Sequence, residues 1–305
     1  MRSWSGCGSK VSGPYVVSGQ MKPHSLRNIS LNTRTTTKTR QLIRQSWEEV
    51  AAEYARDRSG IFGRCAGRLL DLLCLAPGST LLDIGCGTGA VALQAAARVG
   101  SGGWVIGSDI AATMVYLAAQ QETANVSFCQ MNAEQLGFPD APFDTVTCAF
   151  SLFQFPGMGR ALAEMWRVLK PGGRLGLSNW GLGYFSPIAS LQRSLFREFG
   201  LRPLLTNPLV FKPAGLRTLL HEAGFAAVEL IEGTEEVWFE NPEQVWAFDL
   251  DMGPFPVMLR QQLSTEQRRE LERQFMAMLE DLMTEGGIRC TFHLLYALAE
   301  KGGAD

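Results

Sequence analysis

The sequence predicts an α/β protein with a doubly wound, mostly parallel sheet of seven strands, in which the last strand is antiparallel. Three observations predict this class. Short apolar runs alternate with segments of helical periodicity. A glycine-rich turn follows the first run, and 46% of the 305 residues are hydrophobic, which is enough to cover both faces of a sheet. Strands that alternate with helices form βαβ units, which build an open parallel sheet.

Five short apolar runs predict the parallel strands at the centre of the sheet, at 81–85, 104–109, 126–132, 145–151 and 174–180. Helices are expected between them, at 89–98, 112–121 and 158–169. Two longer runs, rich in β-branched and aromatic residues, predict late strands at 227–239 and 288–299. We expect these two strands to pair as a terminal hairpin.

Further helices are expected before and after the parallel strands, near 46–57, 61–75, 187–198 and 213–223. A helical insertion at 242–284 separates the two late strands, and its Ser264 and Gln267 match a capping box. We expect one domain over 45–305 with a cofactor-binding core at 78–180. The segments 45–60, 183–223 and 242–284 are expected to form a lid over an acceptor.

Residues 1–44 are expected to be a disordered tail, dispensable for the fold and for cofactor binding. Residues 1–47 carry eight basic and no acidic residues, and the segment is rich in Ser, Thr and Arg. Such a composition offers little apolar surface to offset the entropy of ordering. A transit peptide for organellar import, or translated sequence ahead of a start at Met21, are alternatives.

Composition excludes several classes of function. The net charge is −2, which leaves −10 for residues 48–305 and argues against nucleic acid as the main partner. No apolar run reaches the length of a membrane span. The seven cysteines form no CxxC pair and there are only three histidines, so we expect reduced thiols, a cytoplasmic location and no metal site.

A glycine-rich turn carries the first chemical signal. Leu81–Gly89 runs from an apolar strand into Gly85, Gly87 and Gly89, and then into a helix. Glycines allow a sharp turn and a close approach of a ligand to the backbone. Asp83 ends the strand before the turn, where it would repel a pyrophosphate but suits a cationic amino group. The G-x-G-x-G spacing and this acid disfavour a nicotinamide oxidoreductase.

Asp109 carries the second signal. It lies at the end of the second predicted strand, 20 residues after Gly89. A carboxylate there can accept hydrogen bonds from both hydroxyls of a ribose. The structural alternative is a cap on the following helix.

Two further motifs complete a family resemblance: Asn132–Pro139 followed by Phe143-Asp144, and Arg167–Arg174 with its Pro-Gly turn. With these four elements in this order, residues 46–180 resemble the class I S-adenosylmethionine-dependent methyltransferases. They are most similar to the ubiquinone/menaquinone-biosynthesis C-methyltransferase group and its small-molecule relatives. The resemblance implies S-adenosyl-L-methionine as the cofactor and a methyltransferase domain over 45–305.

The resemblance also implies a role for each residue of the cofactor site. The glycines wrap the cofactor together with Cys86 and Thr88 of the same loop, and Asp83 faces the methionine amino group. Asp109 takes the ribose, and Ala149 passes beneath the methionine moiety. The residues beside the adenine are Ile110, Asn132 and Ala133.

Departures from that group concern the acceptor. The quinone enzymes usually have serine where Ala149 stands, and they follow it with Phe-Gly-Leu-Arg-Asn-Val. Here the run is Phe150–Phe155, without the Arg-Asn pair. The insertion at 242–284 is also longer than that group needs. These differences argue against a quinone as the acceptor and favour a similarity to relatives that modify natural products.

Aromatic residues of the predicted lid and strand ends are candidates for the acceptor pocket, since ligands bind at the carboxyl ends of parallel strands. They are Tyr54, Phe153, Trp180, Tyr184 and Trp246. The structural alternative is that aromatics at helical spacing are core.

No catalytic residue is identified. We therefore expect methyl transfer by positioning alone, to nitrogen or carbon of a small apolar molecule. The alternatives are an O-methyltransferase, which would normally need a base, and a catalytically silent scaffold that binds the cofactor. The expected partner is the small-molecule substrate, and self-association into a homo-oligomer is left open.

Overall fold

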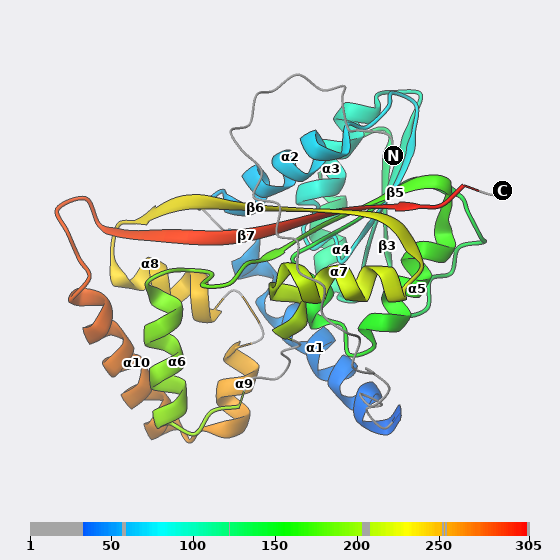
Figure 1. Ribbon diagram of the computed structural model, residues 1–305. Helices are drawn as coiled ribbons and strands as arrows, with labels where there is room; N and C mark the ends of the chain where they lie inside the picture. The colour runs from blue at the N-terminus through cyan, green and yellow to red at the C-terminus, as the bar shows by residue number, and fades with distance from the viewer. Residues whose placement is uncertain are drawn as a thin grey trace.

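The computed structural model describes residues 33–56, 59–121, 123–202, 208–251, 253 and 255–303. It is a seven-stranded sheet with helices on both faces (Figure 1). The strand order is β3-β2-β1-β4-β5-β7-β6, with β1 to β5 parallel and β7 antiparallel to both of its neighbours. The predicted doubly wound α/β class, with its antiparallel last strand, is confirmed.

The strands lie close to their predicted ranges. They are β1 (Thr80–Ile84), β2 (Trp104–Asp109), β3 (Val126–Gln130), β4 (Phe143–Ala149), β5 (Leu169–Trp180), β6 (Phe225–Phe239) and β7 (Ile288–Lys301). The largest difference is in β5, which begins five residues before the expected Arg174. Leu169 pairs with Phe143, and after a register shift Arg174 pairs with Thr145. The Pro-Gly turn therefore lies within the strand.

Helices cover the two faces of the sheet in separate apolar clusters. On one face lie α2 (Ile61–Leu73) and α3 (Ala90–Val99), and on the other lie α5 (Met158–Val168) and α7 (Pro213–Glu222). Helix α2 shows why: Ile61, Cys65, Leu69 and Leu73 recur every four residues and are buried. Helix α4 (Ala112–Ala119) packs against the N-terminal helix α1 (Thr33–Tyr54).

The expected disorder of residues 1–44 is wrong for its last part. Helix α1 begins at Thr33 and includes Arg40, whose guanidinium bonds to both carboxylate oxygens of Glu134. Ile43 is buried in the same helix. A long-range ion pair and an apolar contact thus order a stretch whose composition alone predicts no structure. Residues 1–32, including Met21, lie outside the described residues.

The insertion between β6 and β7 is helical, as expected, but it is broken into pieces. It contains α8 (Pro242–Trp246), the π-helix η3 (Ala247–Asp251), α9 (Phe255–Gln262) and α10 (Thr265–Glu280), which starts with the predicted capping box. These helices and α6 (Ile188–Glu198) gather below one end of the long β6–β7 pair (Figure 1). Short helices η1 (Leu152–Gln154) and η2 (Pro208–Phe211) complete the described elements.

The β6–β7 pair extends beyond the rest of the sheet. Strand β7 pairs with β5 only from Leu294 to Glu300, whereas it pairs with β6 from Ile288 onward. Over 288–293, β6 is the one described strand beside it, apart from a bridge between Thr291 and Ser186. This projecting part consists of residues 234–239 of β6 and 288–293 of β7 and is called the ribbon below. It reaches over the insertion helices.

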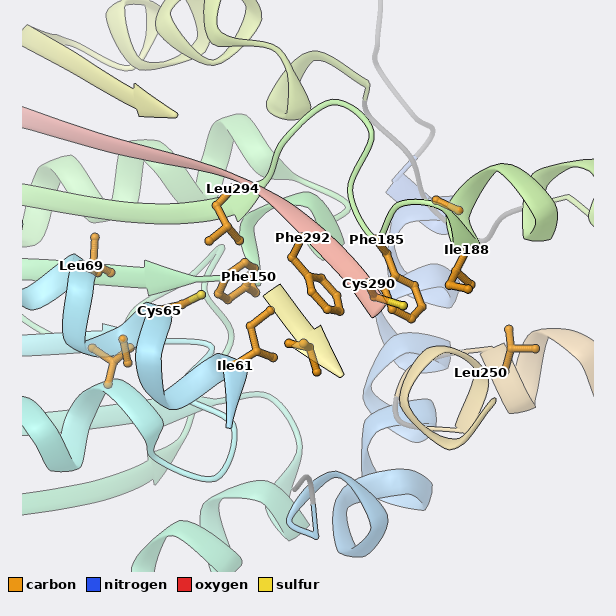
Figure 2. Close-up of a cluster of buried hydrophobic side chains, with 14 of the residues drawn as sticks. Ile61, Cys65, Leu69, Phe150, Phe185, Ile188, Leu250, Cys290, Phe292 and Leu294 are labelled. Carbon is orange, nitrogen blue, oxygen red and sulfur yellow. The ribbon is translucent and has the colours of Figure 1, made fainter. Parts of the chain in front are cut away.

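A buried core joins the sheet to the insertion. Phe150 after β4, Phe185 before α6 and Phe292 of β7 turn toward one another, with Ile61 of α2 close by (Figure 2). The rings of Phe185 and Phe292 are stacked, with centroids 4.7 Å apart. The insertion therefore shares one hydrophobic core with strands β1 and β2 and helices α2 and α3.

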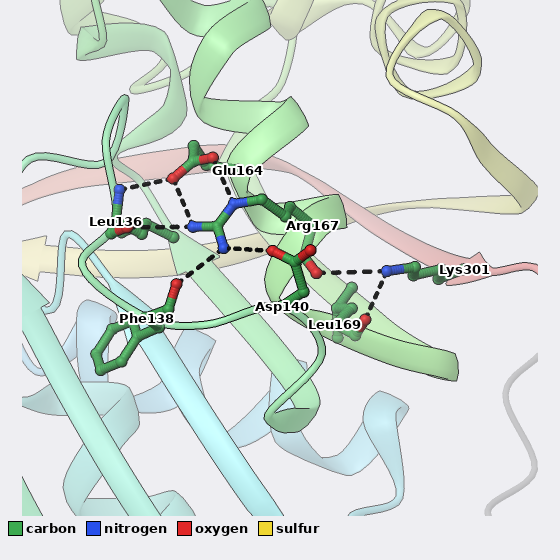
Figure 3. Close-up of polar contacts among 7 residues, drawn as sticks. All are labelled: Leu136, Phe138, Asp140, Glu164, Arg167, Leu169 and Lys301. Carbon is green, nitrogen blue, oxygen red and sulfur yellow. Dashed lines mark hydrogen bonds and ion pairs between the residues drawn. The ribbon is translucent and has the colours of Figure 1, made fainter.

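The Arg167–Arg174 motif has a structural role on the other face. Arg167 donates to the carbonyls of Leu136 and Phe138 and pairs with Glu164 and Asp140 (Figure 3). Glu164 also accepts from the backbone N–H of Leu136. This network fixes the loop after β3, which carries Asn132 and Ala133.

Candidate cofactor and acceptor site

A cavity of about 710 Å³ lies at the carboxyl ends of β1, β2, β4 and β5. Parallel α/β sheets bind ligands at this edge. Helices α1 and α6 and the insertion enclose the cavity on its other sides. The predicted site residues that line it are Tyr54, Asp83, Gly85, Cys86, Gly87, Asp109, Ile110, Asn132, Ala133, Ala149, Phe153, Trp180 and Tyr184.

The glycine turn forms one wall of the cavity. Gly85 and Gly87 have φ values of 67° and 52°, which other residues rarely adopt. A Cβ on Gly85 would lie 2.5 Å from Ser151 Cβ, so this position also requires glycine for space. Thr88 and Gly89 belong to the same turn but do not line the cavity, in contrast to the prediction. Gly89 closes the turn instead, because its N–H donates to the carbonyl of Cys86.

Asp109 holds the turn against the end of β2. One carboxylate oxygen accepts the N–H of Gly87 at 3.0 Å, and the other accepts the N–H of Ala111 at 2.9 Å, just before α4. Burial raises the pKa of this carboxyl. Asp109 therefore joins the glycine turn to Ala111, the residue before α4, without capping that helix, and it also lines the cavity, where it can accept further donors.

Asp83 lies beneath the turn and is almost completely buried, with 1% of its surface exposed. Its Oδ1 accepts the Thr147 hydroxyl at 2.8 Å, while no described residue bonds to Oδ2. Burial raises the pKa of Asp83 to about 7. Asp83 lines the cavity, and a carboxylate with an unsatisfied oxygen there can accept a donor from a ligand, for which a cationic amino group is suited.

Ile110, directly after β2, and Asn132 and Ala133, in the loop after β3, also line the cavity. The side chain of Asn132 accepts the N–H of Glu134 at 3.1 Å. Glu134 is bound by Arg40 and Arg160 and by the N–H of Gly157. Burial opposes its ionisation, but the bonds from the two arginines outweigh burial and lower the pKa of Glu134. The N-terminal helix is thus tied to the cofactor half.

Aromatic rings line the other end of the cavity, called the acceptor lobe below. The centroid of Trp180 lies 4.3 Å from that of Phe150 and 6.1 Å from that of Tyr184. Phe248 of the π-helix stacks on Phe62 at 6.1 Å. Trp246, which the sequence placed among the pocket candidates, does not line the cavity, and its ring packs against Phe275 of α10 at 5.8 Å. The short helix α8 turns it toward the core.

Two polar residues of the acceptor lobe escaped sequence reasoning. Asp249 is buried in the π-helix, and Gln192 of α6 donates to its Oδ2 at 2.8 Å. A π-helix shifts the faces of a helix, so the periodicity of 242–284 could not show where Asp249 points. The signal in the sequence was a carboxylate between Phe248 and Leu250. Neither His221 nor His293 lines the cavity.

Comparisons with known proteins agree with this geometry. Residues 81–173 match a family described as a methyltransferase domain. Residues 81–173 thus form a methyltransferase domain. That domain carries the glycine turn, Asp109 and the loop after β3, which together form the cofactor end of the cavity.

Curated relatives of the methyltransferase domain have different acceptors. A nocamycin O-methyltransferase of Saccharothrix syringae is 41% identical over 160 residues, covering 50% of this chain and 54% of that protein. A ubiquinone/menaquinone biosynthesis C-methyltransferase of Marinomonas sp. is 41% identical over 132 residues, covering 42% and 51%. The chain thus spans about half the length of the curated relatives it matches.

Solved structures share the fold. The YcgJ protein of Bacillus subtilis superimposes with a TM-score of 0.54 at 20% identity, over 78% of this chain and 98% of that one. A SAM-dependent methyltransferase of Thermotoga maritima gives 0.50 at 18% identity, over 85% and 99%. At this identity the similarity concerns the fold alone.

The described residues form neither a metal-binding cluster nor a membrane-spanning helix. In the described ranges, no cluster of three or more His, Cys, Asp or Glu side chains could hold a metal ion. No described helix combines the length and apolar character that crossing a bilayer requires. The six described cysteines are all free, and burial raises the pKa of Cys86 far above its usual value, so its thiol stays neutral and fills space in the turn.

Proposed function

We propose that this chain is an S-adenosylmethionine-dependent methyltransferase that acts on a small, largely apolar molecule. One observation carries the proposal: a single cavity joins the glycine turn and Asp109 at one end to a lobe of aromatic rings at the other. A bound cofactor and an acceptor would then share one enclosed space, as a direct transfer between them requires.

The residues of the cofactor end fit the group. Gly85 and Gly87 leave room for the ligand beside the backbone, and Asp109 offers carboxylate oxygens to ribose hydroxyls. The unsatisfied oxygen of Asp83 suits the amino group of the methionine moiety. When bound, S-adenosylmethionine supplies an electrophilic methyl group. The chain contributes orientation of the two reactants and an apolar site that excludes water.

The acceptor lobe supports an apolar acceptor with a polar group. Its walls are mainly Phe, Tyr and Trp side chains, and the relatives of the domain act on a natural product and on quinone precursors, as their names state. Nitrogen or carbon methylation was expected because no base was visible in the sequence. Asp249 is a carboxylate of the acceptor lobe that could act as a base, so oxygen methylation stands as a second candidate.

The proposal is tested with purified protein and labelled cofactor. Calorimetry should show binding of S-adenosylmethionine and of its demethylated product. Incubation with a small-molecule extract and cofactor carrying a labelled methyl group should yield a labelled product, which mass spectrometry identifies. Cofactor binding without transfer to any component would indicate the silent scaffold instead. Absence of cofactor binding by the folded protein would refute the proposal.

A further inference from the structure

The acceptor lobe contains a buried carboxylate that no charged side chain among the described residues neutralises. Asp249 exposes 8% of its surface and lines the cavity. None of the ion pairs among the described residues includes it. Its hydrogen bond, from Gln192 Nε2 to Oδ2 at 2.8 Å, comes from a neutral amide. A carboxylate in such a place is costly unless a cation pairs with it.

The groups that face Asp249 do not supply this cation. On the loop before α6, the Tyr184 hydroxyl donates to Gln192 Oε1 at 3.4 Å, and burial followed by the charge of Asp249 raises the pKa of Tyr184. On β7, the same two causes raise the pKa of Cys290 to about 12, so both groups stay neutral. Arg193 of α6 lines the cavity but is exposed and makes no ion pair with Asp249.

Gln192 determines which carboxylate oxygen of Asp249 is left for a ligand. Its amide lies between Tyr184 and Asp249, accepting from the first and donating to the second. No described residue donates to Oδ1 of Asp249. Once ionised, Asp249 therefore gives the polar end of the lobe a negatively charged acceptor of hydrogen bonds, which matches a cationic donor.

Aromatic rings surround this end of the lobe. Phe248 precedes Asp249 and lies 5.4 Å from Phe185 and 5.2 Å from Phe292, centroid to centroid. Trp180 lies 5.5 Å from Phe292. Aromatic rings attract cations, most strongly where water is excluded. A carboxylate among several rings matches an ammonium group better than it matches a neutral hydroxyl.

We propose that the acceptor carries a cationic amine, which Asp249 binds as an ion pair among the rings of the acceptor lobe. This deepens the proposed function and rests on it. Burial alone raises the pKa of Asp249 to about 8, so the carboxyl of the empty lobe is mostly protonated at neutral pH. Binding of the ammonium releases that proton to the solvent, and no covalent bond of the amine changes.

The test uses matched pairs of probes in calorimetry at pH 7, with the protein saturated with S-adenosylhomocysteine. The amines are benzylamine, 2-phenylethylamine and tryptamine. Their neutral isosteres, with methyl in place of ammonium, are ethylbenzene, propylbenzene and 3-propylindole. We expect at least one amine to bind at least about tenfold more tightly than its isostere. Titration in two buffers of different ionisation enthalpy should show release of up to about one proton.

The isosteric substitution Asp249→Asn should abolish both the preference for the amine and the proton release. Asp251→Asn, in the same π-helix but outside the cavity lining, is the matched control and should keep both. Neutral isosteres that bind as tightly as every amine would overturn the proposal, as would a preference for the amine that persists in the Asp249→Asn protein. So would 4-ethylphenol binding that depends on Asp249 while amine binding does not, because the carboxylate would then serve a hydroxyl.

Two features keep this test independent of other failures. Proton release is measured on the unaltered protein, so the proposal stays falsifiable if the Asp249→Asn protein does not fold. The amines are also titrated without S-adenosylhomocysteine. A protein that binds an amine through Asp249 but no S-adenosylmethionine would refute the proposed methyl transfer and leave the amine site standing.

Discussion

At the scale of single residues, the carboxylates of the cofactor end do two jobs at once. Asp109 joins the glycine turn to the start of α4 through two backbone N–H groups and also faces the cavity. The sequence placed these jobs as alternatives, because spacing along the chain shows where a carboxylate lies but not how many donors surround it. The structure shows Asp109 bonded to two backbone N–H groups while it lines the cavity, and its ribose role stays a prediction.

Replacing Asp109 with alanine should weaken binding of both S-adenosylmethionine and its demethylated product. The loss of a charged acceptor for two hydroxyls should cost about 1.5–3 kcal/mol, or roughly tenfold or more in Kd. Calorimetry measures this loss of affinity, with Asp71→Ala as the control, since Asp71 is an exposed carboxylate of α2 outside the cavity lining. Unchanged affinity in a folded Asp109→Ala protein would exclude the ribose role.

Asp83 predicts a dependence of stability on pH. Burial raises the pKa of its carboxyl from 3.8 to about 7, so the folded protein holds this proton more tightly than the unfolded chain. The resulting stabilisation is complete below about pH 4 and is lost as the pH rises to about 7. Over that window, the free energy of unfolding of the unaltered protein should fall relative to Asp83→Asn, by on the order of 4 kcal/mol.

Denaturant unfolding of the cofactor-free proteins at several pH values measures this difference. Asp71→Asn, which alters an exposed carboxylate of α2, is the control and should follow the unaltered protein. A constant difference between the Asp83→Asn and unaltered proteins from pH 4 to 7 would show that Asp83 is ionised throughout. The sign of the effect is opposite to that of a salt-bridged carboxylate.

At the scale of elements, the N-terminal helix is part of the site rather than an appendage. Arg40 bonds to Glu134, whose side chain is 3% exposed, and both Arg40 and Ile43 line the cavity. The expectation that residues 1–43 are dispensable for cofactor binding no longer follows. Composition predicted this segment poorly because its ordering depends on one distant partner, 94 residues away.

Arg40→Ala should therefore weaken cofactor binding and lower stability by about 1–3 kcal/mol, because Arg160 remains as a partner of Glu134. Lys38→Ala, at an exposed position of the same helix, should change neither. Calorimetry and thermal unfolding provide the readouts. Equal behaviour of the two variants would mean that the ion pair does not hold α1 in place.

The structure of the insertion changes the prediction for Trp246, which the sequence offered as a candidate for the acceptor pocket. Since its ring packs against Phe275 and not into the cavity, Trp246→Ala should act on stability, by about 3 kcal/mol, and leave cofactor affinity intact. Trp238→Ala, at an exposed tryptophan of β6, is the matched control. Thermal unfolding decides. A raised acceptor KM at unchanged stability would return Trp246 to the acceptor lobe.

At the scale of the whole molecule, the sequence predicted the elements that leave a periodic apolar pattern and missed the features that depend on contacts between distant residues. Alternating apolar runs and helical periods placed every strand within a few residues, because the burial of both sheet faces leaves a local pattern. The glycine turn could be located because backbone geometry demands particular residues there. The directions in which the side chains of Asp249 and Trp246 point could not be predicted, since a π-helix and a short helix change direction without a local signal.

The matched domain builds one part of the cavity, and the ribbon of β6 and β7 with the insertion builds another. The matched domain ends at residue 173, before the ribbon and the insertion, and the parallel strands hold the cofactor end without them. Phe292 and the π-helix, which shape the acceptor lobe, lie on the ribbon and in the segment that connects its strands. Substitutions that change the rings of this segment would therefore reshape the aromatic lobe and leave the glycine turn and Asp109 in place.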